Sequence, residues 1–120
     1  MEETRFALST NDYKNLSNDS FGQSHYFQVY RITGNDEVTL VDTLENVLFM
    51  QACDIQGRAE HLHGLLSEVP YLMGHGFEEQ IQQKLTNSGH VLIEVKPGKL
   101  DHVLEQIKNG ELLPGQTKRN

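Results

Sequence analysis

The order of hydrophobic patterns along the chain predicts an α/β domain, in which helices cover a mixed β-sheet. Two observations support this class. The first third of the 120-residue chain carries short apolar segments of alternating or β-branched character, separated by polar turns. From about residue 58 onward, helical and extended spacings of apolar residues alternate. Strands that come first and then alternate with helices are typical of a sheet with helices packed on it.

Three strands are expected in the first third of the chain. They are Thr4–Ser9, Tyr26–Thr33 and Val38–Thr43, each bounded by polar residues. Residues 34–36 (Gly-Asn-Asp) predict a turn that folds the third strand back on the second as a hairpin. Residues 10–20 are dense in Asn, Asp and Ser, so they predict a loop between the first two strands.

Three helices and two strands are expected in the rest of the domain. Apolar residues at helical spacing predict helices from Arg58 to Pro70, from Phe77 to Gly89 and from Leu100 to Gly110. The intervening strands are Tyr71–Met73 and His90–Val95. Residues 46–56 are the least readable segment and could be an extension of the third strand, a loop or the start of a helix. A single domain is therefore expected over residues 1–112, followed by a flexible tail at 113–120.

The order of elements also predicts how the sheet is arranged. One economical arrangement places the first strand in the middle, the second and third on one side, and the fourth and fifth on the other. That order, 3-2-1-4-5, is the order of the ribonuclease-H-like fold. Ligands in open α/β sheets favour the crevice where the chain reverses its direction across the sheet. Here Ser9–Asp12, with Ser9 and Asn11 as candidate ligand contacts, and Gly74-His75-Gly76 would form its walls.

Gly74, His75 and Gly76 are the leading candidates for ligand binding. Two glycines allow the backbone to approach a ligand closely. The helix expected to begin at Phe77 would offer free N–H groups and a partial positive charge to an anion. The imidazole of His75 could ligate a metal or donate a hydrogen bond. The alternative interpretation is a tight turn that carries an exposed imidazole without a role.

His25 and Cys53 are weaker candidates. His25 precedes the second strand and could point into the same crevice, or it could be an ordinary residue at the start of a strand. Cys53 lies close to a helix start, where a thiolate is favoured, but a lone cysteine is more often a small buried residue. His61 and His63 diverge by about 200° on a helix, so they cannot share one ion. No four-ligand zinc pattern appears in the sequence.

Charge and composition narrow the classes of function. The chain has 17 acidic and 10 basic residues and a net charge of −7, which argues against non-specific nucleic-acid binding. The central strands carry no cluster of acids, so they do not support two-metal nuclease chemistry. The chain shows no basic, apolar leader and no apolar run near the ~20 residues that span a bilayer. The single cysteine cannot form an internal disulfide, so the default expectation is the reducing cytoplasm. We further expect a monomer or weak dimer.

The pattern over nearly the whole chain, from about Thr4 to Leu112, resembles the dinitrogenase iron–molybdenum cofactor biosynthesis family of small NifX- and NifY-like proteins. An opening strand (RFALST) is followed by a polar loop that runs into SFGQSHYFQVYRI, where the family has a comparable FG-x-x-x-YF stretch. An acidic hairpin strand (EVTLVDTLEN), a helix (GRAEHLHGLL) and a strand with a glycine turn (YLMGHGFEEQIQQKL) come next. A strand (HVLIEV) and a final helix that closes in KNGEL complete the resemblance.

This resemblance implies the ribonuclease-H-like fold. It also implies that the protein binds an iron–sulfur or iron–molybdenum cofactor, or a precursor, as a carrier rather than a catalyst. Gly74, His75 and Gly76 occupy the family's glycine turn, which is one residue shorter here. Many relatives carry a histidine or cysteine just before the first helix, and Cys53 is the nearest match. His75 and Cys53 are then the expected metal ligands, and cofactor-assembly or acceptor proteins are the expected partners.

Two other classes of function remain open from the sequence. One is a protein-interaction or regulatory module that kept the fold and lost the ligand, which would take up no cluster but would bind a protein partner. The other is an enzyme that acts on a small anion in the same crevice. The sequence shows no nucleophile–base pair for such an enzyme, and a pH–rate profile that depends on His75 would distinguish it.

Overall fold

The computed structural model describes residues 3–34, 37–46 and 55–112. Cys53 and the expected tail at 113–120 lie outside these residues, so their predicted roles stay predictions. The five strands are β1 (Glu3–Thr10), β2 (Tyr26–Thr33), β3 (Val38–Glu45), β4 (Tyr71–Gly74) and β5 (Val91–Glu94). The helices are α1 (Ile55–Leu65), α2 (Glu79–Asn87) and α3 (Leu100–Lys108), with a short 3-10 turn, η1, at Phe21–Gln23.

The strands form one mixed sheet in the predicted order β3-β2-β1-β4-β5. The strand β2 runs antiparallel to both β1 and β3, which confirms the hairpin. The strands β4 and β1 are parallel, and so are β5 and β4. The carboxyl ends of β1, β4 and β5 therefore meet at one edge of the sheet. The chain leaves β1 toward β2 and leaves β4 toward β5, so the switch point lies between β1 and β4 as predicted.

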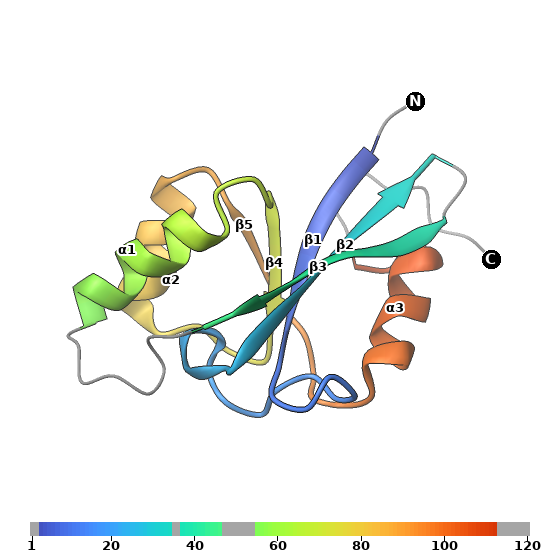
Figure 1. The fold of residues 1–120 in the computed structure, drawn as a ribbon, viewed down its shortest axis with the longest axis horizontal. Coiled ribbons are helices and arrows are strands. Elements are labelled where there is room, and N and C mark those ends of the chain that lie inside the picture. Colours follow the sequence, from blue (N-terminus) through green and yellow to red (C-terminus); the bar gives the residue numbers. More distant parts are fainter. Residues whose placement is uncertain (1–2, 35–36, 47–54, 113–120) are drawn as a thin grey trace.

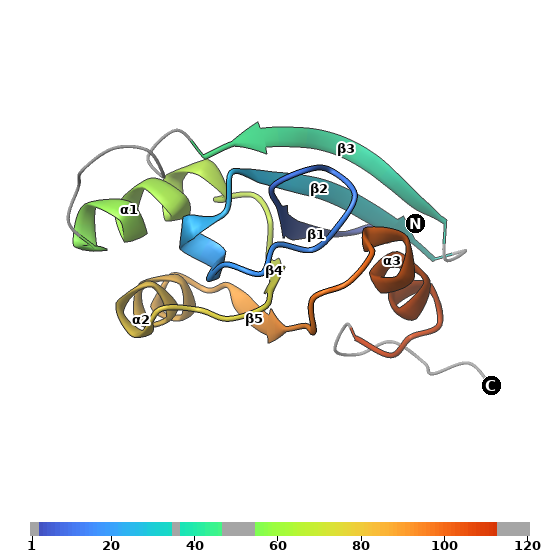
Figure 2. The ribbon, with the colours of Figure 1, turned by 90° about the horizontal axis from the view of Figure 1, so that it is seen from below.

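Helices cover both faces of the sheet. Figures 1 and 2 show α1 and α2 side by side on one face and α3 alone on the other. Two separate apolar clusters fill the spaces between the layers. One lies under α3 and includes Phe6, Leu8 and Ile107, and the other lies under α1 and α2 and includes Phe27, Leu62 and Ile81. This division follows from the alternation of side chains along β1, which is buried on both faces.

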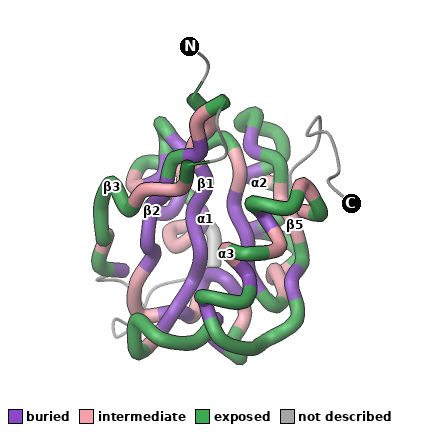
Figure 3. Tube along the Cα trace, turned by 90° about the vertical axis from the view of Figure 1, so that its right-hand side faces the viewer, coloured by how far each residue is buried: buried purple, intermediate pink, exposed green. Residues whose placement is uncertain are grey.

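Burial falls from the centre of the sheet to its edge (Figure 3). The strand β1 is buried over its last five residues, whereas most residues of the edge strand β3 are exposed. Leu40 and Val41 of β3 are 49% and 39% exposed, which is unusual for large apolar side chains. No helix in the described part of the chain is long and apolar enough to cross a membrane.

The helices α2 and α3 each end just before a glycine that the sequence singled out. Gly89 and Gly110 have φ values of +99° and +77°, which favour glycine. At the end of α2, the N–H groups of Gly89 and His90 donate to the carbonyls of Thr86 and Leu85. The same pattern closes α3 at Gly110. Both are Schellman caps, so the predicted stops of these helices are confirmed.

Three helix boundaries differ from the prediction, and the first is the start of α1, at Ile55 rather than Arg58. The helix α1 ends at Leu65 and is followed by a turn, so Pro70 does not itself end it. The helix α2 begins at Glu79 rather than Phe77. The ring of Phe77 stacks on the ring of Phe21 with centroids 5.0 Å apart, and Glu78 keeps an extended backbone as the N-cap. Packing of Phe77 thus outweighs the helical periodicity that it shares with Ile81, and it moves the free N–H groups of α2 away from Gly76.

Candidate functional site

The switch point is formed where β1 and β4 end side by side. Leu8 and Met73 pair in this parallel ladder, so Ser9 and Gly74 follow at neighbouring positions. A Cβ added to Gly74 would lie 3.1 Å from the Oγ of Ser9, which confirms their close approach. Ser9 is fully buried, and its Oγ has no hydrogen-bond partner among the described residues. A buried hydroxyl without a partner is costly, so it marks a position where a ligand could supply one.

The glycine turn after β4 is held in place by η1. The backbone N–H of Phe21 donates to the carbonyl of Gly76 at 2.7 Å, and Val95 donates to the carbonyl of Gly74 at 2.8 Å. A Cβ on Gly74 would also lie 2.9 Å from Cδ1 of Phe21, so glycine is required there by close packing. The neighbours of Gly74 therefore leave no space for a side chain at that position. At Gly76 there is space, because a Cβ there would meet nothing within 4 Å.

His75 is exposed at the middle of this turn. Its neighbours Gly74 and Gly76 are buried and half-buried, so the backbone is anchored on both sides of an accessible imidazole. An imidazole in this position can bind and release a metal-containing ligand without a change in the core. His75 lies in the segment that directly follows the switch-point strand β4, and its role as a ligand stays a prediction.

A hydrogen bond across the loop between β1 and β2 joins the side chain of Asn11 to the backbone of His25. The N–H of His25 donates to Oδ1 of Asn11 at 2.9 Å, and Nδ2 of Asn11 donates to Asp19 at 3.1 Å. The amide of Asn11 thus orders the loop. His25 is half-buried, its ring meets Tyr26 edge-on with centroids 6.3 Å apart, and its carbonyl accepts a hydrogen bond from Asn46 at 2.9 Å.

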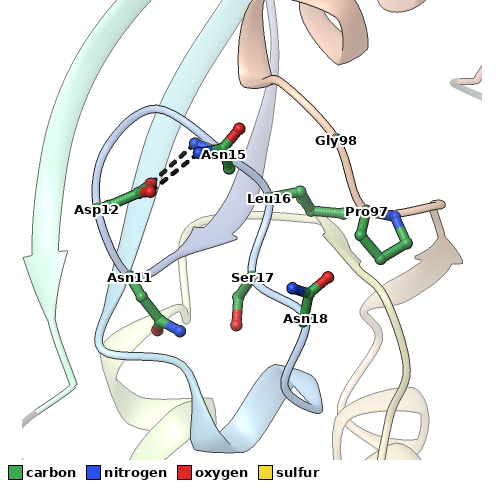
Figure 4. Close-up of a pocket in the computed structure, with 8 residues that line it drawn as sticks. All are labelled: Asn11, Asp12, Asn15, Leu16, Ser17, Asn18, Pro97 and Gly98. Atoms are coloured by element: carbon green, nitrogen blue, oxygen red, sulfur yellow. Dashed lines mark hydrogen bonds between the residues drawn. The ribbon is translucent and has the colours of Figure 1, made fainter.

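A polar pocket of about 400 Å³ lies at the same edge of the sheet (Figure 4). Residues from the loop after β1 and from the turn after β5 line it: Asn11, Asp12, Asn15, Leu16, Ser17, Asn18, Pro97 and Gly98. Of the predicted site residues that the structure describes, Asn11 contributes to this lining, together with Asp12 from the predicted wall Ser9–Asp12. Two backbone hydrogen bonds join the segments, from Leu16 to Gly98 at 2.7 Å and from Leu100 to Lys14 at 2.9 Å. The pairing of these segments is long-range, so the sequence pattern gave no signal for the pocket.

The carboxylate of Asp12 gives the rim of this pocket a fixed negative charge. The side-chain amide of Asn15 and the backbone N–H groups of Lys14 and Asn15 donate to it at 2.8–2.9 Å. The hydrogen bond from the Asn15 side chain is the first of the causes that lower the pKa of Asp12 to about 2. An anionic ligand is therefore better accommodated at the glycine turn than at this rim.

A second feature that the sequence did not reveal is a cluster of hydrogen bonds around Glu78. Its Oε1 accepts from Arg58 of α1 at 2.9 Å, and from Ser20 and Gln23 at 3.3 Å. Both members of the Arg58–Glu78 ion pair are largely buried, with side chains 16% and 27% exposed. This cluster connects α1, η1 and the start of α2 just beyond the glycine turn.

Three comparisons with known proteins bear on this site. The sequence model of the dinitrogenase iron–molybdenum cofactor family matches residues 2–110. A candidate dinitrogenase from Methanocaldococcus jannaschii has a similar structure, with a TM-score of 0.66, 22% identity, and coverage of 94% of this chain and 95% of that one. A candidate NifB protein from Thermotoga, assigned to the DUF35 family, gives a TM-score of 0.62 at 18% identity, over 98% and 99% of the chains. No curated protein matches.

The two structural matches have low sequence identity, so they show a shared fold and nothing further. The family match covers nearly the whole chain, including β1, the FG-x-x-x-YF stretch and the glycine turn. It thereby confirms the resemblance found in the sequence. The chain belongs to the dinitrogenase iron–molybdenum cofactor family.

Proposed function

We propose that this protein is a non-catalytic carrier for an iron–sulfur or iron–molybdenum type cofactor or its precursor. The observation that carries the proposal is the exposed imidazole of His75, anchored between two glycines at the switch point of the sheet. The adjacent Ser9 hydroxyl, buried and without a partner in the described structure, supports a ligand there. Family membership supplies the class of ligand.

The chemistry of this turn suits a cargo that must be handed on. Within the described residues, no three His, Cys, Asp or Glu side chains gather in a group that could hold a metal ion. A cluster held by one exposed imidazole would exchange readily with a partner that offers more ligands. Cofactor-assembly or acceptor proteins would be those partners, in the cytoplasm, where free thiols such as that of Cys53 stay reduced. Cys53 and His25 are further candidate ligands.

The first experiment is an anaerobic titration of the purified protein with an isolated iron–molybdenum cofactor or a [4Fe–4S] cluster. Iron retained after desalting is then measured together with visible absorption. The wild type should retain about one cluster per chain, and His75→Ala should lose most of it while its unfolding curve is unchanged. His102→Ala is the matched control, because His102 is also exposed but lies on α3. Normal cluster retention by His75→Ala would refute the assignment of the ligand.

A second candidate function is a protein-interaction module on the same fold. The exposed Leu40 and Val41 on the edge strand β3 favour this alternative, because an open strand edge can pair with another chain. It predicts that the folded wild type retains no cluster at all. It also predicts that Leu40→Lys weakens the binding of a partner without changing the fold.

A further inference from the structure

A pair of histidines lies at a corner of the molecule that is separate from the glycine turn. His63 is in the last turn of α1, and His90 follows the cap of α2, directly before β5. Their ring centroids are 5.7 Å apart and their ring planes are inclined at 78°. His63 is half-buried, and His90 is only 6% exposed. The two imidazoles are therefore neighbours where the ends of α1 and α2 approach the start of β5.

The hydrogen bonding of His90 fixes which of its nitrogens carries the proton. Its Nδ1 lies 2.8 Å from the carbonyl oxygen of Val69. A carbonyl only accepts, so Nδ1 donates its N–H and the neutral ring has a lone pair on Nε2. Histidines that bind metals commonly have this arrangement, in which a backbone carbonyl orients the ring and the other nitrogen is the ligand.

One nitrogen of each ring in the pair has no hydrogen-bond partner in the described structure. The Nε2 of His90 and the Nδ1 of His63 are both buried, and neither makes a hydrogen bond there. Leaving two buried polar atoms unsatisfied is costly. One ion bound to both nitrogens would satisfy them together.

The surroundings favour a cation and a neutral ligand. The C-terminal ends of α1 and α2 both approach the pair, and the C-terminal end of a helix carries a partial negative charge. Burial, and secondarily the nearby His63, lower the pKa of His90, whereas its hydrogen bond to Val69 acts in the opposite direction.

We propose that His63 and His90 form a two-histidine site for monovalent copper. With metal–nitrogen bonds of about 2 Å, two imidazoles on opposite sides of one ion would have ring centroids about 6 Å apart. The observed 5.7 Å is close to this separation, and ring planes at 78° are compatible with it because each ring can rotate about its own metal–nitrogen bond.

Imidazole binds several metal ions, and the presence of only two histidine ligands in the proposed site favours monovalent copper among them. Structural zinc sites almost always use four protein ligands and catalytic sites three. In the described part of the chain, no third His, Cys, Asp or Glu joins the pair in a metal-binding group. Monovalent copper is stable with two nitrogen ligands, and imidazole is one of its accepted ligands. This site shares no residue with the proposed cluster site at His75.

The test is an anaerobic titration with Cu(I), kept reduced by ascorbate, in competition with bicinchoninate. Because Cys53 could bind Cu(I) through its thiol, all proteins carry Cys53→Ser. This background should bind one Cu(I) per chain, with a two-nitrogen environment in X-ray absorption. His63→Gln removes Nδ1, and His90→Asn removes Nε2 but keeps a donor toward Val69. Each should weaken Cu(I) binding about tenfold or more.

Two controls separate this site from others. His61→Gln changes a half-buried histidine on the same helix, and His75→Ala removes the proposed cluster ligand. Both should bind Cu(I) as tightly as the background protein. Affinity equal to the background in a folded His63→Gln variant would overturn the proposal. So would the absence of any Cu(I) uptake, which would indicate an ordinary buried pair, or uptake that is lost only with His75→Ala.

Discussion

The loop between β1 and β2 contributes one large apolar side chain to each face of the sheet. The two parts of the candidate site near these side chains, the glycine turn and the polar pocket, differ accordingly. Phe21 enters the cluster under α1 and α2, and Leu16 enters the cluster under α3. Around Phe21 the packing is aromatic and tight, with no space for a Cβ on Gly74. Around Leu16 the surface opens into the polar pocket.

This contrast shows how a single loop can fix one wall of a site and leave the other accessible. Phe21 contacts Phe27 and Phe77 with ring centroids 4.7 and 5.0 Å apart, and its N–H donates to Gly76. Leu16 instead joins the loop to Gly98 through its backbone N–H. We therefore expect substitutions at Phe21 to affect the turn that carries His75, and substitutions at Leu16 to leave it unchanged.

The largest expected effect is that of Phe21→Ala. Removal of this fully buried ring should lower the free energy of unfolding by about 3–5 kcal/mol, because it leaves a cavity between α1, α2 and the glycine turn. Leu16→Ala should cost about 2–5 kcal/mol for the same reason under α3. Chemical denaturation measures both. In NMR spectra, the His75 signals should shift in Phe21→Ala only, and an equal shift in Leu16→Ala would contradict the contrast.

An intermediate effect is expected for Gly74→Ala. The new Cβ would lie 2.9 Å from Cδ1 of Phe21 and 3.1 Å from Oγ of Ser9, so the neighbours must move. Overpacking of this kind costs about 1–3 kcal/mol. Gly76→Ala is the matched control, because its Cβ would meet no atom within 4 Å, and a change within about 0.5 kcal/mol is expected. Equal midpoints for the two variants in denaturant would disprove the close approach at Gly74.

The smallest effect concerns Asp12 at the open end of the site. Its pKa is about 2 in the folded protein, against an ordinary value of 3.8. A lowered carboxyl pKa means that Asp12 contributes stability above about pH 4, which is lost as the pH falls through about 2. An NMR titration of the side-chain carboxyl should report this pKa. In Asn15→Ala the pKa should rise toward 3.8, since the Asn15 side chain is the leading cause; no rise would disprove that cause.

The sequence predicted the sheet well because strands follow from local patterns. Tyr26–Thr33 is rich in aromatic and β-branched residues, and its bounds are as expected. The predicted start of α2 was wrong because Phe77 has the spacing of a helical residue, but its ring packs on Phe21, far away in the chain. Residues 47–54, which include Cys53, lie outside the described structure, so the expected ligand role of Cys53 is still a prediction.

The candidate site was predictable only in part. The glycine turn and the switch point followed from the order of the elements, because neighbouring parallel strands place their carboxyl ends at one edge. The polar pocket depends on contacts between residues 11–18 and 97–98, which no local pattern encodes. Glu78 falls inside the helix expected from Phe77 to Gly89, yet it is the N-cap of α2 and pairs with Arg58 of another helix.

The sequence by itself determined the strand order, the helix stops at Gly89 and Gly110, and the family, because these depend on periodicity, glycine conformation and motif order. Only the tertiary structure decided which side chains meet. It placed Phe21 against Gly74, left the Ser9 hydroxyl without a partner in the described residues, and brought His63 to His90. The physical reason is that these contacts join residues separated by 27 or more positions, and the packing of layers, not local propensity, sets such distances.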